Sequence, residues 1–122
     1  MKFAAPIPIF RIFNEAKARE FYVDYLGFTV DWEHRFEPGT PLFMQVSRGD
    51  CKINLSEHHG DASPGSTIRI LVDDLEAYHQ ELTAKQYKYY RPGLQDQSWG
   101  VREMSVEDGN GNKLVFYRPL DR

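Results

Sequence analysis

The feature that most constrains this fold is a weak internal repeat with an offset of 60 residues. When the 122-residue sequence is moved along itself by that offset, residues of similar character meet: Phe10 and Ile70, Ile12 and Val72, Asn14 and Asp74, Tyr22 and Leu82. A half of this length is too small to bury a sufficient core alone. We therefore expect the halves to pair as a curved sheet with the helices outside. Its concave face would need a ligand, a metal site or another subunit to fill it.

The first half begins with a strand that contains two prolines. Residues 6–13 are rich in Ile and Phe, but Pro6 and Pro8 cannot donate ladder hydrogen bonds, so this strand is expected at a sheet edge or crossing between subunits. Asn14 is the predicted N-cap of a helix that ends at Gly27. The inward face of this helix is expected to consist of apolar residues three and four positions apart: Ala18, Phe21, Tyr22, Tyr25 and Leu26.

Alternating hydrophobicity predicts the next strand, over residues 28–36. It is expected to be half-buried, with these side chains on one face: Phe28, Val30, Trp32, His34 and Phe36. Residues 42–47 and 51–57 predict a β-hairpin. A polar stretch over residues 57–65, containing Gly and Pro, then predicts a linker at mid-chain.

The second half repeats the order of strand, helix and three strands. Residues 67–72 predict a strand, and Asp73 or Asp74 is expected to cap a helix, with Glu76 placed for a capping box from Asp73. We expect Leu75, Tyr78 and Leu82 to face the core. Residues 87–90 are a candidate short strand and 91–96 a loop. Residues 97–117 predict strand, tight turn and strand, with the turn at 108–112, where Gly and Asn tolerate positive φ.

Composition excludes several classes of function. Hydrophobic residues make up 41% and charged residues 27% of the chain, as in ordinary globular proteins. The net charge is −3 without a basic block, so nucleic acid is not an expected partner. No apolar run is long enough for a signal peptide or a membrane span, and the lone Cys51 cannot form an intrachain disulfide. We expect a cytoplasmic protein with no membrane partner, in which Cys51 is a small buried hydrophobe.

The duplicated order resembles the vicinal-oxygen-chelate superfamily, which includes glyoxalases, ring-cleaving dioxygenases and bleomycin-resistance proteins. The resemblance covers almost the whole chain and rests on the segments 11–14, 21–22, 26–28 and 108–112. Pro8 within the first strand, and Trp99-Gly100 followed by Arg102-Glu103, resemble the bleomycin-resistance branch. The resemblance implies an α+β fold and a single domain of two βαβββ modules, about 1–60 and 61–122. It also implies a homodimer that exchanges the first strand at Pro8.

The resemblance also locates the positions that hold a divalent metal in the superfamily's enzymes. These positions fall on Ile7, Thr67 and Val115, none of which is a histidine or carboxylate. We therefore predict no metal there and no cofactor. A separate metal or acid–base cluster of His34 and His58 with Glu57 or Glu103 remains an alternative to ordinary solvated or hydrogen-bonded histidines.

The function implied by the resemblance is that of an antibiotic-binding protein. It would hold its drug stoichiometrically in clefts at the dimer interface, without catalytic residues. The glycopeptide bleomycin is the implied ligand, although Arg35, Arg48, Arg91 and Arg102 suit an anionic or neutral aromatic metabolite better. The predicted ligand-binding residues are Trp32, His34, Phe36, Phe43, His58, Trp99, Gly100 and Arg102.

Three alternatives remain open. The aromatic residues Trp32, Phe36, Phe43 and Trp99 could be core residues, and Arg102 could form a surface ion pair. The chain could be a lyase or dioxygenase-like enzyme of the same superfamily with a non-standard or absent metal site. The concave face could also serve dimerisation alone.

Overall fold

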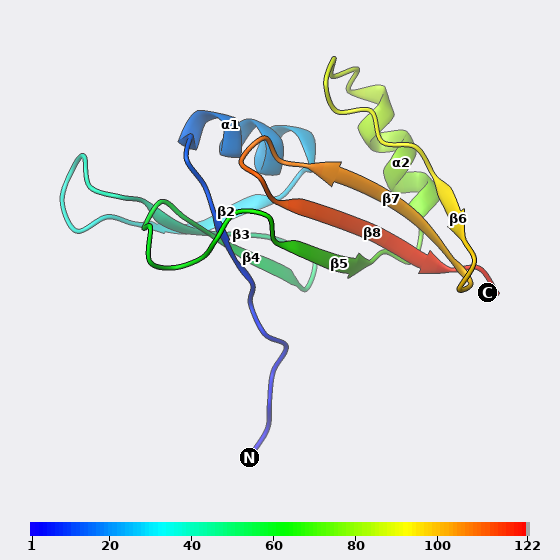
Figure 1. The fold of residues 1–122 in the computed structure, drawn as a ribbon, viewed down its shortest axis with the longest axis horizontal. Coiled ribbons are helices and arrows are strands. Elements are labelled where there is room, and N and C mark those ends of the chain that lie inside the picture. The colour runs from blue at the N-terminus through cyan, green and yellow to red at the C-terminus, as the bar shows by residue number, and fades with distance from the viewer. Residues whose placement is uncertain (122) are drawn as a thin grey trace. The chain divides into compact units, whose positions relative to one another are not determined.

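The computed structural model describes residues 1–121, and the chain divides into two compact units, Met1–Pro64 (unit 1) and Gly65–Arg122 (unit 2). Each unit has its own four-stranded sheet (Figure 1). Unit 1 contains β1 (Ile9–Arg11), α1 (Glu15–Arg19), the π-helix η1 (Glu20–Tyr25), β2 (Thr29–His34), β3 (Phe43–Arg48) and β4 (Cys51–Ser56). Unit 2 contains β5 (Thr67–Leu71), α2 (Leu75–Ala84), β6 (Gln95–Gln97), β7 (Val101–Glu107) and β8 (Lys113–Pro119).

The two sheets have the same topology, which confirms the predicted α+β fold of two βαβββ modules. The strand order is β1-β4-β3-β2 in unit 1 and β5-β8-β7-β6 in unit 2. In each sheet the first strand pairs in parallel with the last strand, and the other pairs are antiparallel. The first strand is shorter than predicted, because β1 begins after Pro8, and it lies at the sheet edge as expected. None of the helices within residues 1–121 has the length and apolarity needed to cross a bilayer.

The helical segment of unit 1 supplies the aromatic part of its core. The Asn14 side chain accepts a hydrogen bond from the Lys17 amide at 3.0 Å, as predicted for an N-cap. All five apolar residues predicted for the inward face are fully buried. The last turn widens into a π-helix, which the sequence pattern did not predict, and the Leu26 amide donates to the Phe21 carbonyl at 2.9 Å. Gly27 follows with φ of 78°, consistent with its predicted role in ending the helix.

Strand β2 differs from its prediction. Its register shifts between Val30 and Trp32, so Val30 pairs with Val46 whereas Trp32 pairs with Gln45. The bulge moves Trp32 to the face opposite Val30. The prediction of a half-buried strand is wrong for this chain, because the last four residues of β2, Asp31 to His34, are all exposed.

The turn chemistry of unit 2 also corrects two expectations. Asp74, not Asp73, caps α2 by accepting from the Ala77 amide at 3.1 Å, and Glu76 bonds to arginines of the sheet instead of forming a capping box. Residues 87–90 form no strand, and the edge strand β6 begins at Gln95, in the segment predicted as a loop. Leu75, Tyr78 and Leu82 are buried as predicted, and Tyr78 meets Phe116 of β8 edge to face at 5.2 Å.

The β7–β8 turn is organised around one buried carboxylate. Asp108 accepts hydrogen bonds from the Asn110 amide at 2.7 Å, the Asn112 amide at 3.0 Å and the Asn112 side chain at 2.9 Å. Gly109 and Gly111 have φ of 77° and 93°, which confirms the predicted positive-φ turn.

Candidate functional site

The sheet of unit 1 has two unlike faces. The face toward the helices is fully buried and apolar, with Phe10, Met44, Val46, Ile53 and Leu55. Ladder partners share a face, so the register places a different set of side chains on the other side. We call this side the open face of unit 1, and it includes Ile9, Arg11, Trp32, His34, Phe43, Gln45 and Asn54.

An aromatic row runs along β2 and β3 on this open face. The Trp32 and Phe43 rings lie 5.6 Å apart, and His34 pairs with Phe43 in the ladder. The His34 ring also meets Phe36 edge to face at 5.1 Å. Trp32 is 42% and Phe36 is 80% exposed, so neither is a core residue of this chain, and Phe43 is half-buried. The structure thus brings four of the predicted ligand-binding residues together.

The bulge at β2 adds an acidic group that sequence reasoning missed. Asp31 accepts hydrogen bonds from the Gln45 amide at 2.9 Å and the Ser47 hydroxyl at 2.8 Å. These bonds, the one from Gln45 foremost, lower the pKa of Asp31 below its usual value. A carboxylate is therefore held charged next to Trp32. A bulge leaves no signal in an alternating pattern, so the sequence could not have located it.

The open face of unit 2 carries a polar cluster instead of an aromatic row. Arg69 of β5 donates to Glu103 of β7 at 2.6 Å, and its guanidinium lies 4.4 Å from the centre of the Tyr117 ring. The Gln97 amide donates to the other Glu103 oxygen at 3.3 Å. Glu103 is only 8% exposed, which makes it a buried charged group on a sheet face. We call these residues the Arg69 cluster: Arg69, Gln97, Glu103 and Tyr117.

Arg102 lies on the opposite, helix-bearing face of unit 2. Its guanidinium donates to Asp96 at 2.6 Å and to Glu76 of α2 at 2.8 Å. Arg102 therefore forms ion pairs, which was the alternative that the sequence left open for this residue. The signal was present in the sequence, because Arg102 alternates in phase with Met104 and Val106, which are both buried.

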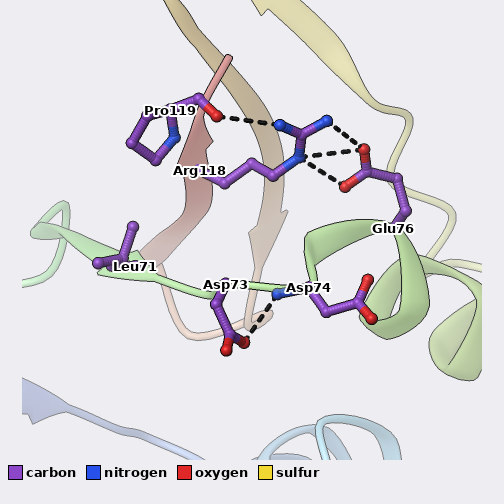
Figure 2. A pocket seen from close by; sticks show the side chains of 6 residues that line it. All are labelled: Leu71, Asp73, Asp74, Glu76, Arg118 and Pro119. Atoms are coloured by element: carbon purple, nitrogen blue, oxygen red, sulfur yellow. Dashed lines mark hydrogen bonds and ion pairs between the residues drawn. The ribbon is translucent and has the colours of Figure 1, made fainter. Parts of the chain in front are cut away.

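Glu76 lies at the edge of a surface pocket of about 410 Å³ in unit 2 (Figure 2). The Arg118 guanidinium donates to Glu76 at 2.5 Å and to the Pro119 carbonyl at 2.9 Å (Figure 2). Asp73 accepts from the Asp74 amide at 2.8 Å. The hydrogen bond from Arg118 is the main cause that lowers the pKa of Glu76 to about 2. These groups form hydrogen bonds with one another. We therefore interpret the polar residues of this pocket as a structural link between α2 and the sheet.

Three predicted site residues lie on turns. Trp99 is 63% exposed in the β6–β7 turn, and Gly100 beside it has φ of 88°, a backbone role that explains the glycine. His58 lies in the loop after β4, and its amide donates to the Ser56 hydroxyl at 3.1 Å. Their predicted contact with a ligand remains a prediction.

A metal site has no candidate within the described part of the chain. Nowhere in residues 1–121 do three His, Cys, Asp or Glu side chains gather as a group that could hold a metal ion. Ile7 precedes β1, Thr67 begins β5 and Val115 lies within β8, and none of them has a nitrogen or carboxylate donor. Cys51 is half-buried, and burial raises the pKa of its thiol, which reduces its reactivity.

A family model described as glyoxalase superfamily protein matches residues 1–121. The chain therefore belongs to the glyoxalase superfamily. No curated protein sequence was found to match it.

Solved structures with the same fold include antibiotic-binding proteins and an antibiotic resistance determinant. The bleomycin-binding protein of Streptomyces verticillus, in complex with copper(II)-bleomycin, is 28% identical over 95% of this chain and 96% of its own, with a TM-score of 0.68. A bleomycin resistance determinant encoded on the transposon Tn5 is 20% identical over 96% and 98%, with a TM-score of 0.73. The antibiotic-binding protein TnmS3 of Streptomyces sp. CB03234 is 19% identical over 98% and 99%, with a TM-score of 0.67.

Proposed function

We propose that this protein binds a small aromatic molecule of the antibiotic class and sequesters it without breaking a bond. The observation that carries the proposal is the aromatic row of unit 1, with Trp32 42% and Phe36 80% exposed. Flat rings gain both buried area and stacking energy on such a surface. The similarity to the bleomycin-binding protein of Streptomyces verticillus, at 28% identity, supports the same type of function.

We further propose that the active form is a homodimer in which residues 1–8 pack against the partner. Figure 1 shows this segment leaving the sheet of unit 1. Phe3 is 91% and Ile7 is 41% exposed, and an apolar arm of this kind is typical of a surface that another chain covers. The Pro8 carbonyl accepts from the Asn54 amide at 2.9 Å, so the arm leaves unit 1 immediately before β1. This position suits a hinge for strand exchange.

Titration calorimetry with metal-free bleomycin tests the proposed function. Binding near one drug per subunit is expected, and Trp32→Ala should weaken it by roughly tenfold because stacking and buried area are lost. Tyr89→Ala is the matched control, since Tyr89 is an 83% exposed aromatic residue outside the aromatic row. Equal binding by the wild type and Trp32→Ala would contradict this assignment of the site. No heat at low or high salt would remove bleomycin as the ligand.

A further inference from the structure

The Arg69 cluster places a buried carboxylate where an apolar residue would serve stability at least as well. Glu103 is 8% exposed on the open face of unit 2 and is paired with Arg69 at 2.6 Å. Removing a charge from water is costly, and a buried ion pair often contributes no more stability than packed apolar side chains. Stability alone therefore does not account for the Arg69–Glu103 pair, and we consider a role in ligand binding.

The geometry holds the Arg69 guanidinium on two sides. Glu103 accepts from its Nη1 atom, and its Cζ atom lies over the Tyr117 ring, 4.4 Å from the ring centre. Gln97 holds the other Glu103 oxygen at 3.3 Å, which fixes the carboxylate in turn. A guanidinium has five N–H donors in a rigid fork. Within residues 1–121 the bond to Glu103 is the one hydrogen bond of the Arg69 side chain, which remains 43% exposed.

We infer that Arg69 binds an anionic group of the ligand, such as a carboxylate or sulfonate, while Glu103 acts as the positioning residue that orients the guanidinium. The inference rests on the proposed function, because it names the chemical class of ligand that the open face of unit 2 would bind. Leu71 is 54% exposed and is the ladder partner of Tyr117, so an apolar surface lies next to the Arg69 guanidinium. An anionic group attached to a flat ring fits this arrangement.

Two fluorescent probes with the same aromatic skeleton test the inference. 1-Anilinonaphthalene-8-sulfonate carries a sulfonate, and N-phenyl-1-naphthylamine carries no charge. In fluorescence titrations the wild type is expected to bind the sulfonate probe roughly tenfold more tightly, as a charge-assisted bond predicts. Arg69→Gln should abolish this preference and leave the affinity for the neutral probe within about twofold. Lys88→Gln, which removes an exposed positive charge after α2, should keep the preference.

Two further variants test the roles of the Arg69 guanidinium and of Glu103 separately. Arg69→Lys retains the charge and the pairing with Glu103 but loses the fork, so its preference should be intermediate. This variant also serves if Arg69→Gln does not fold. Glu103→Gln should reduce the preference for the sulfonate probe without weakening the neutral probe, whereas a purely structural role would weaken both alike.

The failures are distinguishable. Equal wild-type affinity for both probes, or a preference that survives Arg69→Gln, would overturn the role of Arg69 and leave the aromatic row as a binding surface. Absence of binding by either probe, together with no heat from bleomycin, would overturn the proposed function as well.

Discussion

Val30 and Trp32 are two positions apart in β2, yet they lie on opposite faces of the sheet of unit 1. The register shift at Asp31 separates them, so that Val30 meets Val46 and Trp32 meets Gln45. Without the shift, both side chains would share one face. The aromatic row therefore depends on a single extra residue, and the hydrogen bonds of Asp31 to Gln45 and Ser47 hold that residue in place.

Trp32 fluorescence should report directly on the open face of unit 1. In a Trp99→Phe variant, Trp32 is the remaining tryptophan of the chain, and its 42% exposure makes it accessible to acrylamide. A ligand that stacks on Trp32 should lower the quenching constant, because it covers the ring. Trp32→Phe is the reciprocal control, in which Trp99 reports instead. An unchanged quenching constant in Trp99→Phe at saturating ligand would exclude stacking on Trp32.

Glu76 should make the stability of unit 2 depend on acid pH. Its pKa in the folded chain is about 2 instead of 4.5, so its contribution is fully present above about pH 5 and is lost as the pH falls toward 2. Urea unfolding at several pH values should show a smaller loss of stability with acid in Glu76→Gln than in the wild type. Glu107→Gln, at an exposed strand position, should retain the wild-type slope. Identical slopes in Glu76→Gln and the wild type would rule out this linkage.

Asp108→Ala should destabilise the β7–β8 turn. Asp108 is fully buried and accepts three hydrogen bonds, each of which the substitution removes. We expect a loss of roughly 2–4 kcal/mol in the free energy of unfolding, measured by urea denaturation. Asp50→Ala, in the exposed β3–β4 turn, is the control and should change stability by less than about 0.5 kcal/mol. A comparable loss in both variants would argue against a special role for Asp108.

The exposed arm of residues 1–8 should govern the oligomeric state. Replacing Phe3 and Ile7 together by serine removes the apolar side chains proposed to contact a second chain. Sedimentation equilibrium should then show a shift from the dimer toward the 14.2 kDa monomer. Replacing Phe13, which is 58% exposed outside the arm, by serine should leave the mass unchanged. A wild type that is monomeric at all concentrations would contradict the proposed dimer.

Sequence reasoning succeeded where structure is decided locally. The Asn14 cap, the end of the helix at Gly27 and the positive-φ turn at 108–112 each depend on residues within a few positions of one another. The apolar helix face was also predictable, because period and burial agree there. These features were enough to identify the duplicated modules.

The candidate site was less predictable because it depends on pairing between distant strands. The Arg69 cluster joins positions 34 residues apart in the chain, and its members have no common spacing. The bulge at Asp31 and the edge strand β6, with the polar sequence Gln-Asp-Gln, also leave no hydrophobic pattern. Arg102 is different, since its alternation with Met104 and Val106 indicated the helix-bearing face.

The π-helix η1 also records a difference in length between the two halves. The helix N-caps Asn14 and Asp74 are 60 positions apart, whereas the left-handed residues that follow the helices, Gly27 and Gln86, are 59 apart. The first helical segment therefore contains one more residue than the second. The wide turn of η1 accommodates this extra residue, so both ends of the helical segment keep their positions. A one-residue insertion or deletion after duplication would leave this trace. A repeat search at a fixed period therefore loses register at η1. Removing one residue from 20–25 should restore an ordinary α-helical turn.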